Sequence, residues 1–165
     1  MSTARNMNSR PGAKFAGRPA GSLLEIDTWI LSEIKAITPL VERLMRLIEG
    51  SHCVKGEEPA VELALHEALQ NAVVHGNRLH AQKLVHVRCR CAVGKGISIT
   101  VSDQGDGFDL NAIPNPLSVE DLMAEHGRGI HLMKVLMDEV SFDRRGAEVR
   151  MVKRPADYTR TNLKE

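Results

Sequence analysis

The strongest helical pattern in the chain lies in residues 57–77, EEPAVELALHEALQNAVVHGN. At 100° per residue, its main apolar side chains fall on one stripe that can pack against another element. This stripe consists of Val61, Leu65, Ala68, Leu69 and Ala72. Gly76 ends the pattern. We therefore expect one long helix over this segment, buried along one side.

A polar pair interrupts a second, otherwise apolar face of this helix. Glu67 and Asn71 lie one turn apart among alanine, leucine and valine side chains. Burying a carboxylate and an amide without partners is costly. A structural hydrogen-bond network would compensate, and so would a metal–phosphate site. In the second case Asn71 offers a neutral oxygen to Mg²⁺ and Glu67 accepts a proton from an attacking hydroxyl.

A second feature is a strand pattern that ends at a carboxylate. Residues 97–101, ISITV, alternate as a strand does, and the segment DQGDGFD follows. Asp103 comes first, and Gly105 and Gly107 follow at alternate positions. One interpretation is a surface turn, because Asp and Gly are common turn residues. The other is a backbone that lets another group approach closely.

The third feature is a glycine pair in front of an apolar helical pattern. Gly127, Arg128 and Gly129 lead directly into residues 128–140, RGIHLMKVLMDEV. The free N–H groups at the start of a helix and its positive dipole end attract anions, and Arg128 adds a positive charge. The motif is weak evidence by itself, because helix starts tolerate glycine.

The stretch between these glycine pairs, residues 104–127, is long for a loop in a compact domain. Glycines at both of its ends predict a lid with two hinges, and a simple insertion is the alternative.

The remaining segments predict a small domain of mixed secondary structure. A first strand is expected over residues 22–30, a helix from Thr38 to Gly50 or from as early as Ser32, paired strands over 84–93 and 97–101, and a final hairpin over 140–152. We expect the folded domain to span residues 22–154, between a flexible arm over 1–21 and a polar tail over 155–165.

Charge and composition exclude several classes of function. Four of the 22 basic residues and none of the 21 acidic ones lie in the arm, so the body of the chain is slightly acidic. A basic face for nucleic acid is therefore not expected, and with 3% aromatic residues neither is a stacking platform. No apolar run approaches the length of a membrane span. The three cysteines, Cys53, Cys89 and Cys91, are expected to be reduced thiols of a cytoplasmic protein.

The order and spacing of the three features are those of a known family. The segments HEALQNAVVHG, DQGDGFD and GRGIHLM resemble the N, G1 and G2 boxes of the GHKL ATP-binding superfamily, which includes gyrase B subunits, MutL-type repair proteins and histidine kinases. Within it, the short single domain resembles the bacterial anti-sigma-factor serine kinases. The resemblance implies an α+β fold, a two-layer sandwich whose mixed, mostly antiparallel sheet is covered on one face by helices.

The resemblance also implies a role for each motif residue. Asp103 would receive the adenine amino group, and Gly105 and Gly107 would let the backbone pass close to the base. Asn71 would ligate Mg²⁺, and Glu67 would be the general base. The phosphates of ATP would be wrapped by the backbone of Gly127, Arg128, Gly129 and Ile130.

The function implied is that of an ATP-dependent protein serine kinase and anti-sigma factor. Its partners would be a sigma factor and an anti-sigma-factor antagonist of the STAS type, which it phosphorylates on serine, and it would form a homodimer. The alternative is a protein of the same fold that binds ATP only to set a partner surface. ATP hydrolysis coupled to dimer closure would need a transducer domain, and an α+β domain that binds no nucleotide is the remaining possibility.

Overall fold

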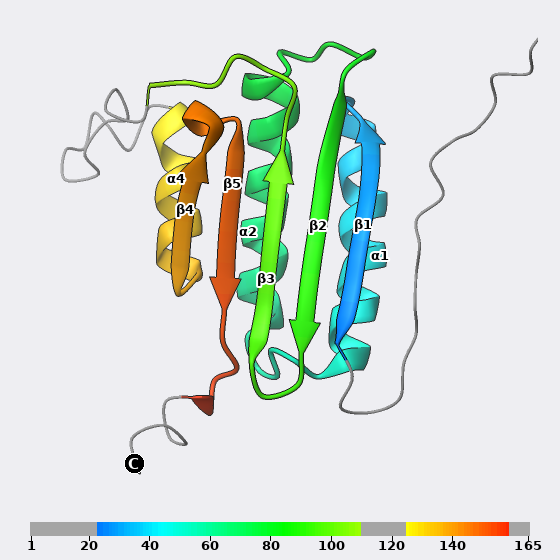
Figure 1. The fold of residues 1–165 in the computed structure, drawn as a ribbon, viewed down its shortest axis with the longest axis vertical. Coiled ribbons are helices and arrows are strands. Elements are labelled where there is room, and N and C mark those ends of the chain that lie inside the picture. The colour runs from blue at the N-terminus through cyan, green and yellow to red at the C-terminus, as the bar shows by residue number, and fades with distance from the viewer. Residues whose placement is uncertain (1–22, 110–124, 159–165) are drawn as a thin grey trace, which may run out of the picture.

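The chain folds into two layers, a five-stranded sheet and a row of helices on one of its faces (Figure 1). The computed structural model describes residues 23–109 and 125–158. Along the chain the strands and main helices are β1 (Leu24–Leu31), α1 (Ile37–Ser51), α2 (Glu58–Gln70), β2 (Leu84–Ala92), β3 (Gly96–Ser102), α4 (Glu125–Leu136), β4 (Glu139–Asp143) and β5 (Glu148–Lys153). Short helical turns precede α1 (Ile34–Ala36), follow α2 (Asn71–Gly76) and join β4 to β5 (Arg144–Gly146).

The sheet has the strand order β1-β2-β3-β5-β4, and each of the four pairings between described strands is antiparallel. The expected α+β sandwich is therefore confirmed, although the described sheet is antiparallel throughout rather than mixed. The reason lies in the connections. Tight turns join β2 to β3 and β4 to β5, while two helices in succession return the chain from β1 to β2.

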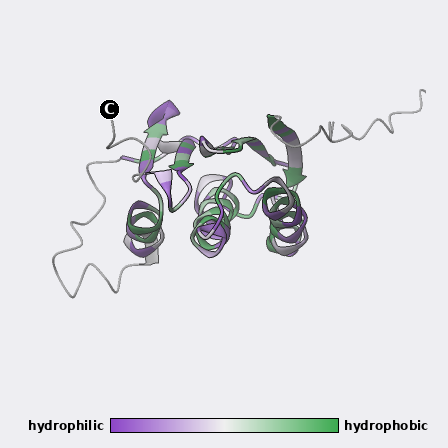
Figure 2. Ribbon diagram, turned by 90° about the horizontal axis from the view of Figure 1, so that it is seen from below, coloured by the Kyte–Doolittle hydropathy of each residue, from purple (hydrophilic) through white to green (hydrophobic). Residues whose placement is uncertain are grey.

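Alternation along the strands places the core between the layers. In β2 the side chains of Val85, Val87, Cys89 and Cys91 are buried, while Arg88 and Arg90 between them are exposed. The predicted stripe of α2 is likewise buried, from Val61 to Ala72. Figure 2 looks along the helices and shows them side by side beneath the sheet. The C-terminal ends of α2 and β3, which Asn71 and Asp103 follow, thereby lie at the same end of the molecule (Figure 1).

Some predicted boundaries differ from the structure. Helical structure before α1 begins at Ile34, between the two predicted starts, and α1 ends at Ser51, where His52 takes a left-handed conformation (φ 55°). The basic arm over 1–21, most of the long stretch (110–124) and the end of the tail (159–165) lie outside the described residues. In the part that is described, no helix is long and apolar enough to cross a membrane.

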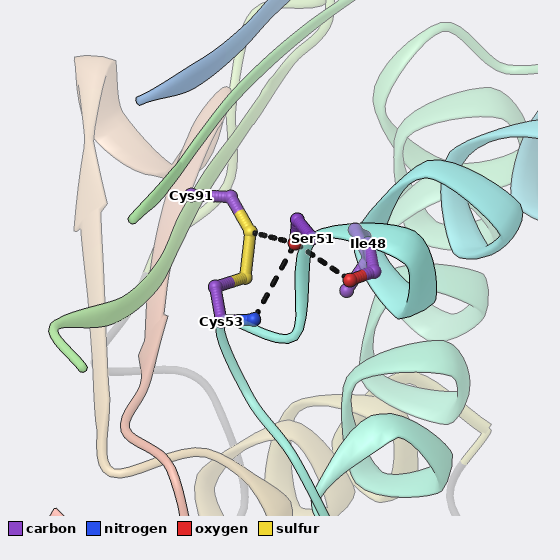
Figure 3. Close-up of a disulfide and its surroundings, with 4 residues drawn as sticks. All are labelled: Ile48, Ser51, Cys53 and Cys91. Atoms are coloured by element: carbon purple, nitrogen blue, oxygen red, sulfur yellow. Dashed lines mark hydrogen bonds between the residues drawn. A yellow bond between two sulfur atoms is a disulfide. The ribbon is translucent and has the colours of Figure 1, made fainter. Parts of the chain in front are cut away.

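The cysteines correct the expectation of reduced thiols, because Cys53 and Cys91 form a disulfide (Figure 3). Cys53 follows the end of α1, and Cys91 lies near the end of β2, 38 residues further on. The Ser51 hydroxyl donates to the Ile48 carbonyl (2.6 Å) and lies 2.9 Å from the Cys91 sulfur. Local spacing could not reveal this pair, because tertiary packing of α1 against the sheet brings the two residues together. Cys89 is a buried free thiol, and burial raises its pKa to about 12.

Removing this disulfide is expected to destabilise the fold. A bridge that closes a loop of this length contributes about 2–4 kcal/mol by restricting the unfolded chain. The double variant Cys53→Ser/Cys91→Ser should therefore melt at a lower temperature than the oxidised protein, with Cys89→Ser as the single-thiol control. Equal melting temperatures with and without a reductant would show that the bridge contributes nothing.

Candidate nucleotide-binding site

A cavity of about 510 Å³ lies between the helix pair α2–α4 and the β3-β5-β4 half of the sheet. Its size is typical of small-molecule sites, which range over about 300–1,000 Å³. Its walls are formed by Ala68, Asn71, Ala72, Val74, His75, Gly76, Arg78, Val101, Asp103, Gly107, Phe108, Asp109, Ile130, Met133, Phe142, Gly146, Ala147 and Val149. It thus joins residues from all three motifs, with an apolar lining and a few polar groups.

Residues Asn71–Gly76 form a π-helical turn rather than a continuation of the α-helix. This corrects the prediction of one helix running to Gly76. The α-helix α2 ends at Gln70. The N–H of Asn77 accordingly donates to the carbonyl of Ala72, five residues earlier, at 2.8 Å. Such single turns often occur at functional sites. This one brings five of its six residues to the cavity wall.

Asp103 is a buried carboxylate on the cavity wall, directly after β3. Its N–H donates to the carbonyl of Ala147 at 2.9 Å, and its Oδ1 accepts the N–H of Gly105 at 2.7 Å. Burial raises the pKa of this carboxyl, while the Gly105 N–H and the charges of Arg144 and Lys83 oppose that rise. Its second carboxylate oxygen accepts no hydrogen bond that the structure records among described residues.

Two glycines allow the π-turn and the Asp103 loop to touch. A Cβ atom on Gly76 would collide with the Asp103 carboxylate, and one on Gly105 would collide with the carbonyl oxygen of Gly76. Neither position has room for any side chain, so close approach explains these glycines better than turn geometry does.

The next glycine, Gly107, serves a real turn, with φ +80°. A Cβ there would meet the carbonyl oxygen of Arg145, which accepts the N–H of Phe108 at 2.8 Å. The Phe108 ring meets that of Phe142 edge-on, with centroids 5.9 Å apart. The β4–β5 turn therefore holds the start of the long stretch, and the Phe108–Phe142 pair adds an aromatic wall to the cavity.

Gly127, Arg128 and Gly129 lie inside α4 rather than in a turn ahead of it, because the helix begins at Glu125. This corrects the predicted start. Gly127 and Gly129 are buried, whereas Arg128 is exposed. A Cβ on Gly129 would lie 2.7 Å from Oε2 of Glu67 and 3.3 Å from Nδ2 of Asn71. The N and G2 motifs thus meet where α4 crosses α2, and helix packing outweighs the low helix propensity of glycine.

The structure brings the predicted residues together, although only some of them line the cavity. Asn71, Asp103, Gly107 and Ile130 do so. Gly105 supports Asp103, while half-buried Glu67 adjoins Asn71 at Gly129. Sequence reasoning did not identify the aromatic wall, His75, Arg78 or the β4–β5 turn. Phe108 lay within a quoted motif, but nothing local to Phe142 or Gly146 signalled a site.

The polar groups suit a magnesium-bound triphosphate. The structure shows no cluster of three or more His, Cys, Asp or Glu side chains within residues 23–109 and 125–158 that could hold a metal. Near Gly129, however, the Glu67 carboxylate and the Asn71 amide pack against the same glycine, with Oε2 of Glu67 2.7 Å and Oδ1 of Asn71 3.4 Å from the position of an added Cβ. Mg²⁺ in nucleotide sites is commonly held by one or two protein oxygens together with phosphates.

Comparison with known proteins identifies relatives of this chain. The Bacillus licheniformis protein named Serine-protein kinase RsbW is 39% identical over 87 residues, which cover 48% of this chain and 53% of the relative. Proteins of the same name from Staphylococcus epidermidis (31% over 99 residues, 56% and 62%) and Bacillus subtilis strain 168 (31% over 86 residues, 48% and 53%) are also similar. The matched part of the chain spans only about half to three fifths of these relatives.

The model of the histidine kinase-like ATPase domain family matches residues 30–153. That range contains all three motifs, the cavity and nearly every described strand and helix. This protein therefore belongs to the family of histidine kinase-like ATPase domains.

Proposed function

We propose that this protein is an ATP-dependent protein serine kinase that also acts as an anti-sigma factor. The observation that carries the proposal is a cavity with the buried Asp103 carboxylate on its wall and the contact of Glu67 and Asn71 with Gly129 beside it. The names of the relatives support the kinase activity. The substrate would be a serine of a STAS-type antagonist, and the sequestered partner would be a sigma factor. With these partners the protein would act in the cytoplasm.

The geometry supports a separate task for each end of the site. Asp103 would accept the adenine amino group, in a pocket that Gly76 and Gly105 keep open. Asn71 would ligate Mg²⁺ with the phosphate oxygens, and the ion would neutralise charge on the transferring group. The phosphates would lie against the first two turns of α4, which contain Gly127 to Ile130, where the positive end of the helix dipole favours anions.

Glu67 would act on the incoming serine. In this step the serine oxygen forms a bond to the γ-phosphorus, the bond to the β-phosphate oxygen breaks, and ADP leaves. The hydroxyl proton passes to the Glu67 carboxylate. Two observations support this role: Glu67 is half-buried, and its carboxylate packs against Gly129 beside Asn71, which lines the cavity.

Calorimetry with Mg-ATP, followed by transfer of labelled γ-phosphate to a STAS antagonist, tests the proposal. Heat of binding together with a new phosphoserine is the expected result. Binding without transfer would instead favour the ATP-dependent regulatory protein, and absence of binding would refute both. Light scattering with and without nucleotide tests the proposed homodimer.

Affinity for ATP is expected to fall as the pH is lowered. The fall should begin at a higher pH than it would if Asp103 had the pKa of an ordinary aspartate. Burial raises the pKa of Asp103, so its carboxylate takes up a proton, and loses an acceptor, above the usual value of about 4. Folding stability changes in the opposite sense, because protonation removes a buried charge. Dissociation constants measured from neutral to acid pH check this. Asp103→Asn is the control, since it retains the ionisation of ATP itself but should lose the contribution of the carboxyl.

A further inference from the structure

A buried amide outside the three motif roles holds the base end of the cavity. Asn77 follows the π-turn and is 0% exposed. Its Nδ2 donates to the carbonyl of Leu84 at 3.0 Å, and its Oδ1 accepts the N–H of Gln104 at 2.8 Å. Both ends of the amide are therefore satisfied by backbone groups of two different strand ends.

Gln104 completes the arrangement from the other side. Its side-chain Oε1 accepts the N–H of Leu84 at 2.7 Å. Both backbone groups of Leu84 are thus bound by side-chain amides. The three hydrogen bonds therefore form a closed ring, which runs from Asn77 to Leu84, from Leu84 to Gln104 and from Gln104 back to Asn77.

This ring occupies the place where the β2–β3 ladder would continue. The last pair of the ladder is His86 opposite Ser102. Two residues further in the same register, Leu84 stands opposite Gln104, and backbone bonds between them would extend the pairing. The Asn77 amide is inserted there instead. It holds the end of β3 away from β2 and directs the chain toward the cavity.

Asp103 lies between the last ladder residue and this ring. Its N–H is held by Ala147 on one side, and Gln104 next to it is held by Asn77 on the other. Its carboxylate faces Gly76, the residue before Asn77. Two neighbouring residues therefore act on Asp103. Gly76 makes room for its carboxylate, and the Asn77 amide fixes the backbone of the next residue, Gln104.

We propose that Asn77, together with Gln104, is a positioning residue that sets the Asp103 carboxylate and so determines the preference for adenine over other purines. The inference rests on the proposed function, in which Asp103 accepts the 6-amino group. It assigns specificity to two amides that do not touch the nucleotide.

A comparison of ATP with inosine triphosphate tests this role. The two differ at position 6, where inosine carries an oxygen that cannot donate to a carboxylate. Wild-type protein is expected to bind ATP at least about 10-fold more tightly, which corresponds to one charge-assisted hydrogen bond. In Asn77→Ala the affinity for ATP should fall toward that for inosine triphosphate, and the latter should stay within about threefold of wild type. A merely structural role would weaken both nucleotides by the same factor.

Gln104 provides variants that are safe for folding, because its side chain lies at the surface. Gln104→Ala should lower the preference for ATP several-fold. Gln104→Glu should retain it, since a carboxylate oxygen still accepts the Leu84 N–H. Gln82→Ala, an exposed glutamine of the preceding loop, is the matched control. Thermal melting shows which variants fold, and the Gln104 variants decide the question if Asn77→Ala does not.

Two outcomes would overturn the inference, namely an unchanged preference in both alanine variants or an equal loss for both nucleotides. Wild-type protein that binds neither nucleotide would refute the proposed function itself, and the inference with it. If wild-type protein prefers ATP to inosine triphosphate and both alanine variants keep that preference, the positioning role is refuted while the proposed function stands.

Discussion

Replacing Glu67 with glutamine is expected to slow phosphate transfer at least about 100-fold, while Mg-ATP still binds. Glutamine has the same shape as glutamate, so the contact with Gly129 and Asn71 is retained. It cannot accept the serine proton, however, and general-base catalysis contributes about 10²–10⁴-fold to such reactions. Single-turnover transfer to the STAS antagonist measures the loss, and calorimetry measures binding.

Glu62→Gln is the matched control for this experiment. Glu62 lies on the same helix but is exposed to solvent. Its replacement should leave both transfer and binding as in wild type. Full transfer by Glu67→Gln would remove Glu67 from the mechanism, and loss of ATP binding in that variant would indicate that the side chain supports the site instead.

A single methyl group at Gly76 is expected to abolish most of the affinity for ATP. The alanine Cβ would collide with the buried Asp103 carboxylate, whose Oδ1 is already held by the Gly105 N–H. Either the carboxylate leaves its place or the π-turn moves, and both distort the base end of the cavity. We expect a loss of affinity of about 100-fold or more and a destabilisation of about 1–3 kcal/mol from overpacking.

Gly50→Ala separates this effect from the general cost of replacing a glycine. Gly50 lies in the last turn of α1, where a Cβ would meet nothing within 4 Å. Alanine there should stabilise the helix by up to about 1 kcal/mol and leave ATP binding unchanged. Wild-type affinity in Gly76→Ala would contradict the close packing that the structure shows.

The fold was predictable as far as local patterns reach. Alternation along residues 97–101 and the helical stripe from Val61 to Ala72 both reappear as buried faces. The fold class also followed from the resemblance of the three motifs to a known family. The π-turn over Asn71–Gly76 could not be predicted, because its sequence continues the helical pattern. Its close contact with the Asp103 carboxylate at Gly76 is seen only in the structure.

The sequence by itself determined which residues could form a site, namely a carboxylate after a strand, a polar pair on an apolar helix face and two glycine pairs. For Gly105 it left two explanations open, a surface turn and close approach of another group. Tertiary structure alone decided that Gly76 faces Asp103, that Gly129 faces Glu67, and that Asn77 separates two strands. It alone joined Cys53 to Cys91 as well. The physical reason is that local patterns report which face of an element is buried, whereas these contacts join residues far apart in the chain and depend on how the layers pack.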